Sequence, residues 1–176
     1  MQRARPWVDP LFVAIAIGLY AVDQLTKAWV TRALGPEAER HSVQVLGDVV
    51  RLSYTTNTGA AFGIFPNQPI VFTLIALIAI PTIWLFNRNM TPRTVLTRVC
   101  LGALLGGALG NVTDRLRLGR VTDFVDVGVG DLRWPAFNVA DSAFVVGIFA
   151  LTVIVFLLEQ GRRSHQEEPR GESRYA

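Results

Sequence analysis

The chain has 176 residues, of which 51% are hydrophobic and 18% charged, and its formal net charge is +3. It is more apolar than an average soluble domain, and its length is that of one domain. Its basic residues are scattered rather than grouped on one face, which argues against a nucleic-acid-binding protein. The single cysteine, Cys100, excludes an intramolecular disulfide and a cysteine-based metal site, and His41 and His165 are too far apart to suggest a histidine site.

Four apolar segments have the length that a helix needs to cross a bilayer, which is about 20 residues. They are residues 10–31, 69–86, 94–112 and 136–158. Pro10 and Pro69 stand at predicted helix starts, where a missing N–H costs little. Pro81 lies inside the second segment and is expected to kink it. The pattern predicts an all-α membrane bundle of four transmembrane helices.

The arginines of the short loops suggest an orientation. Those before the first helix, between the second and third, and after the fourth slightly outnumber those of the other two loops. The positive-inside rule then places both termini in the cytoplasm. Residues 1–160 form one predicted transmembrane domain, and the polar residues 161–176 form a predicted disordered cytoplasmic tail.

The first outer loop is too long for a simple turn. Its residues 42–57 alternate apolar and polar side chains on both sides of Gly47 and Asp48, which predicts two short strands joined by a tight turn. The sequence NTGAAFGIF follows, and it suits a turn and a short amphipathic piece on the membrane surface. We therefore expect a small sheet, at about residues 42–68, that covers the outer end of the bundle.

The third apolar segment carries a row of small residues. Gly102, Gly106 and Gly110 recur at four-residue spacing, with Gly107 alongside. In membrane helices such a face lets two backbones approach closely, so it predicts helix packing rather than ligand binding.

Each ionisable residue at membrane depth is costly and needs a partner or a use. Asp23 and Lys27 are four residues apart on one helix face and are expected to form an ion pair. Asn111, Asp114 and Arg115 share a face at the outer end of the third helix. There, Arg115 is expected to offset the charge of Asp114, and the group is predicted to tie the helix end to a loop.

Asp141 is different because its helix holds no Lys or Arg before the inner boundary. It lies about 8 Å below the surface, counted at 1.5 Å per residue, with Asn138 and Ser142 on the same face. Its carboxyl must be protonated, hydrated or shared. Acidic candidates in the preceding loop are Asp123, Asp126 and Asp131, and spacing does not choose among them. Two carboxyls forced together share one proton, which supplies the acid and the base for peptide hydrolysis.

Two other classes of protein fit the same acids. A small proton-coupled membrane transporter would relay protons through Asp23, Asp114 and Asp141, but these acids crowd the outer half of the bundle and leave the inner half apolar. A non-catalytic membrane assembly factor would use them only for structure.

Four blocks in order resemble one family. They are the first helix with Asp23, Gln24 and Lys27, then NTGAAFG at 57–63, GNVTDRLRLGRVTDF at 110–124 and FNVADS at 137–142. Together they resemble the bacterial lipoprotein signal peptidases, or signal peptidase II, over nearly the whole chain. The resemblance implies an intramembrane aspartic endopeptidase of the bacterial inner membrane. It also implies an extracytoplasmic β-cradle and a short surface helix beside the four transmembrane helices.

The resemblance implies a substrate and a site as well. The substrates would be prolipoproteins, cut before a cysteine modified with diacylglycerol, with membrane lipids as the other partners and no nucleic acid. The site would face the extracytoplasmic side and use neither a metal nor an organic cofactor. Matched position by position, Asp123 and Asp141 would be the catalytic pair. Asn57, Asn111, Arg115 and Asn138 would bind substrate or support the pair, and Asp23, Lys27 and Asp114 would be structural.

Overall fold

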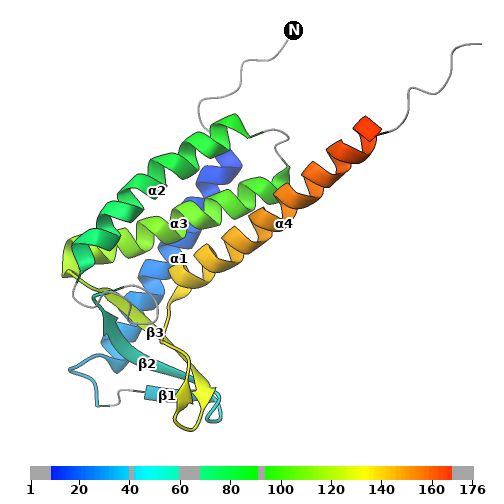
Figure 1. Ribbon diagram of the computed structural model, residues 1–176. Coiled ribbons are helices and arrows are strands. Elements are labelled where there is room, and N and C mark those ends of the chain that lie inside the picture. The colour runs from blue at the N-terminus through cyan, green and yellow to red at the C-terminus, as the bar shows by residue number, and fades with distance from the viewer. Residues whose placement is uncertain (1–8, 40–41, 60–67, 91–93, 168–176) are drawn as a thin grey trace, which may run out of the picture.

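The computed structural model describes residues 9–39, 42–59, 68–90 and 94–167 (Figure 1). Its helices are α1 (Pro10–Leu34), α2 (Pro69–Asn89), α3 (Val95–Leu118) and α4 (Val139–Glu167), and its strands are β1 (Ser42–Leu46), β2 (Val50–Asn57), β3 (Val121–Val129) and β4 (Leu132–Arg133). In this part of the chain, four helices are long and apolar enough to cross a membrane. The predicted four-helix bundle is therefore confirmed.

The helices run further than the apolar segments that predict them. α2 continues through Pro81 to Asn89, and α3 continues to Leu118. α4 extends to Glu167, so the first residues of the tail predicted to be disordered are helical. A helix ends where its backbone groups find other partners rather than where apolar residues stop, which explains why hydropathy underestimates these lengths. Residues 168–176 lie outside the described residues.

The strands form one antiparallel sheet in the order β1-β2-β3-β4. The predicted hairpin is confirmed, with Gly47 at a φ of 51° in its turn. β3 and β4 were not predicted. β3 pairs along β2, and its other edge is bridged by Phe137, which pairs with Val125. The predicted surface helix falls on residues 60–67, which lie outside the described residues.

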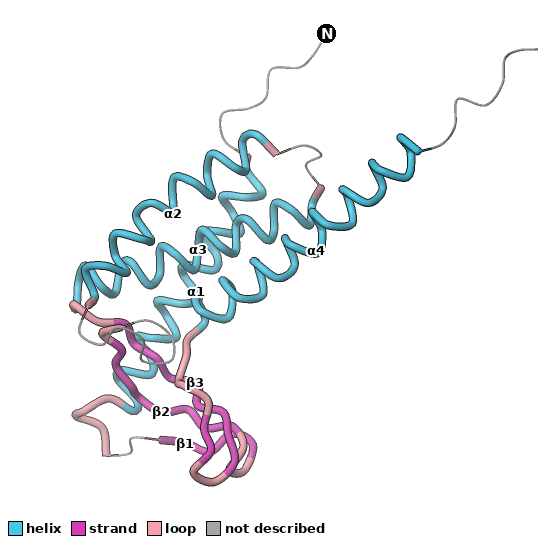
Figure 2. The backbone as a smooth tube through the Cα atoms, viewed as in Figure 1, coloured by secondary structure: helices cyan, strands magenta, loops and turns pink. Residues whose placement is uncertain are grey.

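The sheet lies at one end of the bundle, where α1 and α3 end and α2 and α4 begin (Figures 1 and 2). Successive helices alternate in direction, so α1 begins and α4 ends at the opposite end of the bundle. α3 ends at Gly119, whose φ of 69° is left-handed and readily adopted by glycine. This turn sends the chain directly from α3 into β3.

α3 is the most buried helix, and its glycines explain why. A side chain at Gly102 or Gly106 would meet the backbone oxygens of Phe12 or Ala16 on α1, and one at Gly107 would meet the backbone oxygen of Ala140 on α4. The predicted packing face is therefore confirmed. It brings α1 close to α3 from the end of the bundle opposite the sheet toward its middle, and it brings the first turn of α4 close to α3.

Candidate active site

The first turn of α4 holds Asp141 in a reciprocal cap. The backbone N–H of Asp141 donates to Oδ1 of Asn138 at 2.9 Å, and the backbone N–H of Asn138 donates to Oδ2 of Asp141 at 3.1 Å. This is the capping-box arrangement, in which a residue at the helix cap and the third helical residue satisfy each other's free N–H groups. The Asp141 carboxyl is therefore fixed in direction by the start of its own helix.

Asp123 projects from β3 toward the same asparagine. Its side chain is almost completely buried, and its Oδ1 accepts a hydrogen bond from Nδ2 of Asn138 at 2.7 Å. The sheet creates this contact, because the N–H groups of Phe124 and Val125 donate to the carbonyl of Phe137 at 3.0 and 2.8 Å. The chain just before α4 is thus laid along the edge of β3. Asn138 touches both candidate catalytic carboxyls.

The surroundings of Asp123 favour its protonated form. Burial raises the pKa of the Asp123 carboxyl to about 7, and the nearby charge of Asp141 adds to the rise. Hydrogen bonds from Asn138 and Asn57 act in the opposite direction, as does the charge of Lys27. The two carboxyls are therefore close enough to interact electrostatically, and one of them retains a proton near neutral pH.

Asn111 on α3 supports the pair from the other side. Its Nδ2 donates to Oδ1 of Asp141 at 2.7 Å. Its Oδ1 accepts from Nζ of Lys27 at 2.9 Å and from Nδ2 of Asn138 at 3.2 Å. Because an ammonium group donates only, Lys27 fixes the oxygen end of this amide and so leaves the N–H end for Asp141.

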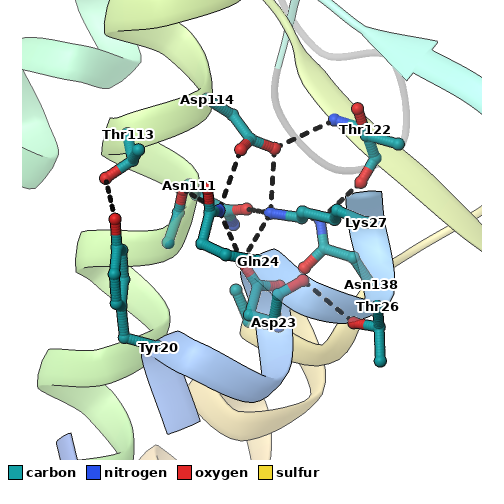
Figure 3. A network of polar contacts seen from close by, with 12 residues as sticks. Tyr20, Asp23, Gln24, Thr26, Lys27, Asn111, Thr113, Asp114, Thr122 and Asn138 are labelled. Atoms are coloured by element: carbon teal, nitrogen blue, oxygen red, sulfur yellow. Dashed lines mark hydrogen bonds and ion pairs between the residues drawn. The ribbon is translucent and has the colours of Figure 1, made fainter. Parts of the chain in front are cut away.

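Lys27 is the centre of a buried ionic cluster (Figure 3). Its Nζ lies 2.9 Å from Oδ2 of Asp23 and 3.0 Å from Oδ2 of Asp114, and the three side chains are at most 5% exposed. Gln24 bridges the two acids, with its Nε2 3.2 Å from Oδ2 of Asp23 and 3.0 Å from Oδ1 of Asp114. The predicted pair of Asp23 and Lys27 is confirmed, and α3 adds a second carboxylate.

The same cluster ties four elements together. Oδ1 of Asp23, on α1, accepts from the backbone N–H of Ala140 at the start of α4, at 3.0 Å. Oδ2 of Asp114, on α3, accepts from the backbone N–H of Thr122 on β3, at 3.2 Å. The helix end is thus tied to the segment that follows it, as predicted. The expected pairing of Asp114 with Arg115 is replaced by the ion pair with Lys27.

Arg115 and Asn57 border the pair. Nη2 of Arg115 donates to the carbonyl of Gly59 at 3.4 Å, and its guanidinium lies 5.8 Å from the ring centre of Phe72. Oδ1 of Asn57 accepts from the backbone N–H of Gly59 at 2.8 Å. Both residues therefore contact Gly59, just after the end of β2.

The two other acidic candidates lie away from Asp141. Asp126 forms an ion pair with Arg133 at 2.6 Å, and Asp131 is exposed in the turn between β3 and β4. Sequence reasoning gave no role to Gln24 or Thr122, although both contact the cluster. A signal for Gln24 was available, because it is a polar residue next to Asp23 within an apolar helix.

The chain is similar to known proteins over most of its length. The family model described as signal peptidase (SPase) II matches residues 15–157. A lipoprotein signal peptidase of Moorella thermoacetica is 39% identical over 153 residues, which span 86% of this chain and 97% of the relative. One of Syntrophotalea carbinolica is 40% identical over 141 residues, spanning 78% and 86%.

Solved structures agree with the sequence relatives. A bacterial membrane enzyme solved by the in meso method at 2.3 Å resolution superimposes with a TM-score of 0.73 at 27% identity, covering 92% of this chain and 94% of that one. Another, at 1.9 Å resolution, gives a TM-score of 0.69 at 27% identity and covers 82% and 91%.

Proposed function

The chain belongs to the signal peptidase II family, and we propose that it is an aspartic endopeptidase whose catalytic pair is Asp123 and Asp141. It removes signal peptides from prolipoproteins, which its family and its relatives' shared name, lipoprotein signal peptidase, support. The observation that supports the pair is its common partner, since Asn138 donates one hydrogen bond to each carboxyl. Aspartic catalysis requires two such carboxyls that share one proton.

The two carboxyls differ in ways that assign their roles. Asp141 accepts N–H groups from Asn111 and Asn138 and lies in the first turn of α4, where the helix dipole favours negative charge. Asp123 lies in a strand and is almost completely buried, with a pKa raised to about 7 by that burial. We therefore assign the base to Asp141 and the acid to Asp123.

The proposed reaction follows from these roles. A water molecule held between the carboxyls gives one proton to Asp141, and its oxygen attacks the scissile carbonyl carbon. Asp123 gives its proton to the carbonyl oxygen, which forms a neutral tetrahedral diol. The diol returns one proton to Asp123, and Asp141 passes its proton to the amide nitrogen as the C–N bond breaks. Each carboxyl returns to its starting state.

The surroundings suit a substrate that is held in a membrane. The proposed cleavage position is before a cysteine modified with diacylglycerol, whose acyl chains would lie in the bilayer beside the helices. Asn57 and Arg115 border the pair at the end of β2 and are proposed to hold the substrate backbone. The sheet end would face outward, with both termini in the cytoplasm, and residues 1–160 would act as one domain.

The test uses the purified protein in lipid vesicles. A precursor modified with diacylglycerol and the same precursor without the lipid are incubated with it, and cleavage before the cysteine is measured. We expect cleavage of the modified precursor only. Asp123→Asn and Asp141→Asn should each reduce the rate by about 100-fold or more, while Asp126→Asn, on the same strand, should retain it. Retained cleavage in both catalytic variants would overturn the assignment of the pair, whereas no cleavage by the unmodified protein would support a transporter or an assembly factor.

A further inference from the structure

The sheet has one apolar face that extends beyond the helices. In an antiparallel sheet, directly paired residues share a face, and so do alternate residues of a strand. The register pairs Val43 with Leu52 and Leu52 with Val125, then Leu46 with Val50 and Val50 with Val127, and finally Val129 with Leu132. Because residues 125, 127 and 129 alternate along β3, all of these apolar side chains lie on one face.

The direction of this face is given by Asp123. Asp123 precedes Val125 by two residues on β3, so its side chain leaves the same face, and it points to Asn138 at the start of α4. Where the sheet meets the helices, Leu52 and Val125 pack in a cluster with Val30 and Leu34 of α1. The apolar face therefore looks toward the helix bundle.

Farther from the helices, the same face of the sheet is no longer covered by other side chains. Val125 and Val127 are half-buried, whereas Val129 is 68% exposed and Leu132 is 85% exposed. On β1, which β2 separates from β3, Leu46 is 65% exposed. Figure 1 shows why, because the sheet runs sideways from the helix ends and its far turns project beyond them.

The opposite face carries charges that are paired with one another. Arg133 forms an ion pair with Asp126 and also donates to the carbonyl of Asp48, and Arg51 pairs with the Asp48 side chain. The register places Gln44, Arg51 and Asp126 side by side on this face. Asp48 also accepts from the backbone N–H of Gly130 at 2.9 Å, which joins the turns of the two hairpins. The far end of the sheet is thus a rigid unit with two unlike faces.

We propose that the apolar face beyond the bundle, formed by Leu46, Val129 and Leu132, rests on the lipid bilayer. The helices that cross the membrane fix the position of the bilayer beside the sheet. Where the sheet meets the helices, its apolar face is directed toward the bundle. Beyond the helix ends, the same face is directed toward the plane of the membrane. Lipid then covers the apolar side chains, and the face with Arg51 and Arg133 meets water. The exposed Asp131, in the turn, keeps this contact at the depth of the headgroups.

Trp134 supports this placement. It follows Arg133, so the alternation of side chains puts it on the apolar side, and it is 57% exposed. Tryptophan is enriched at the membrane interface because its ring is apolar and its N–H is polar. The contact would hold the sheet, and with it Asp123, at a constant depth relative to substrates anchored in the same bilayer.

Spin labels on the two faces test the proposal. Leu132→Cys and the matched control Gln44→Cys, on the opposite face, are each made with Cys100→Ala and carry a nitroxide. The protein is placed in vesicles of phosphatidylcholine and phosphatidylglycerol, and collision rates with oxygen and with a water-soluble nickel chelate are measured. We expect the oxygen-to-nickel ratio to be several-fold higher at residue 132 than at residue 44. Equal ratios would overturn the proposal, as would protection of residue 132 from both reagents, which indicates a protein partner.

A second measurement does not depend on labelling. The double substitution Val129→Glu and Leu132→Glu, with Gln44→Glu as its control, is tested for precursor cleavage in vesicles and in detergent. We expect slower cleavage in vesicles and an unchanged rate in detergent, because only the bilayer fixes the depth of the sheet. Equal rates in vesicles, or an equal loss in both media, would contradict a role in membrane contact.

Discussion

Asn138 and Asp141 hold each other by two backbone-to-side-chain hydrogen bonds, of 2.9 and 3.1 Å, at the start of α4. A common device for starting a helix is thus combined with a candidate catalytic carboxyl. The Asn138 amide that closes the cap also reaches Asp123 through its Nδ2. The Asn138 side chain therefore orients the Asp141 carboxyl and also donates a hydrogen bond to the Asp123 carboxyl.

This double role can be separated by substitution. In Asn138→Ser the hydroxyl still caps the helix, but the amide donor to Asp123 is lost. We expect cleavage to fall roughly tenfold to 100-fold, from the loss of one hydrogen bond to a carboxyl. We also expect a loss of stability of about 1–3 kcal/mol, because the buried amide donates to the carbonyl of Thr122 and to Oδ1 of Asn111 as well. In Asn138→Ala the cap is lost as well, at a further cost of about 1 kcal/mol.

Cleavage rates and thermal unfolding of both Asn138 variants give the check. Ser142→Ala is a suitable control, because its hydroxyl donates to the backbone carbonyl of Asn138 at 3.0 Å and touches neither carboxyl. Full activity in Asn138→Ser would show that the contact with Asp123 does not contribute.

The raised pKa of Asp123 predicts a pH dependence. Burial and the charge of Asp141 raise this pKa to about 7, so the acid form that the reaction needs is lost as the pH rises through about 7. Cleavage should decline over the same range. Removing the charge in Asp141→Asn should lower the pKa of Asp123 and shift its titration to lower pH.

Labelling of Asp123 with a carbodiimide, which reacts with protonated carboxyls, would follow this titration directly in both proteins. The folded state retains a proton on Asp123 that the unfolded chain has released, so this group stabilises the fold at low pH. That contribution declines as the pH rises from about 4 to about 7. A labelling curve that does not shift in Asp141→Asn would mean that the two carboxyls are not coupled.

The sequence predicts Asp141 but not its partner, and the reason is physical. The free-energy cost of a carboxyl without a nearby cation in a membrane helix can be recognised from the sequence of that helix alone. The choice among Asp123, Asp126 and Asp131 depends on the register of a strand, since Asp123 and Asp126 leave opposite faces of β3. That register is set by pairing with β2, which lies far away in the chain. The proposal of Asp123 as the partner therefore comes from the resemblance to a family and not from a local pattern.

Local sequence patterns predict only part of the ionic cluster as well. The pairing of Asp23 with Lys27 follows from their spacing on one helix. The third member, Asp114, is brought in by the register between α1 and α3, which depends on close approach at glycines. Arg115 was the nearer candidate in sequence, but its guanidinium turns toward Gly59 instead.

The cluster predicts an unequal response to the loss of a cation. In Lys27→Met, two buried carboxylates lose their shared partner, and we expect a loss of roughly 3–5 kcal/mol. In Arg51→Met, a half-exposed ion pair with Asp48 is lost, which should cost about 1 kcal/mol or less. Chemical unfolding in detergent would measure both.

Neutralising the partners provides a further control for Lys27. Asp23→Asn and Asp114→Asn, added to Lys27→Met, should recover much of the stability, because a buried ionic group can often be replaced by a neutral one. If Lys27→Met and Arg51→Met lose the same amount, the buried cluster is not a main source of stability.

Gly110 is the point where packing and the candidate site depend on each other. A Cβ at this position would meet the carboxylate of Asp23 and would lie 3.5 Å from the Cβ of Ala140. Gly110→Ala should therefore push Asp23 away from Lys27 and from the backbone N–H of Ala140. Ala140 lies in the first turn of α4, the helix that holds Asp141. We expect a loss of about 1–3 kcal/mol from overpacking and a clear fall in cleavage.

Gly18→Ala on α1 is the matched control for Gly110→Ala, because a Cβ there has no neighbour within 4 Å. That change should leave activity intact and should not destabilise the helix. If both variants behave like the unmodified protein, then the close approach of α1, α3 and α4 at Gly110 does not position the site.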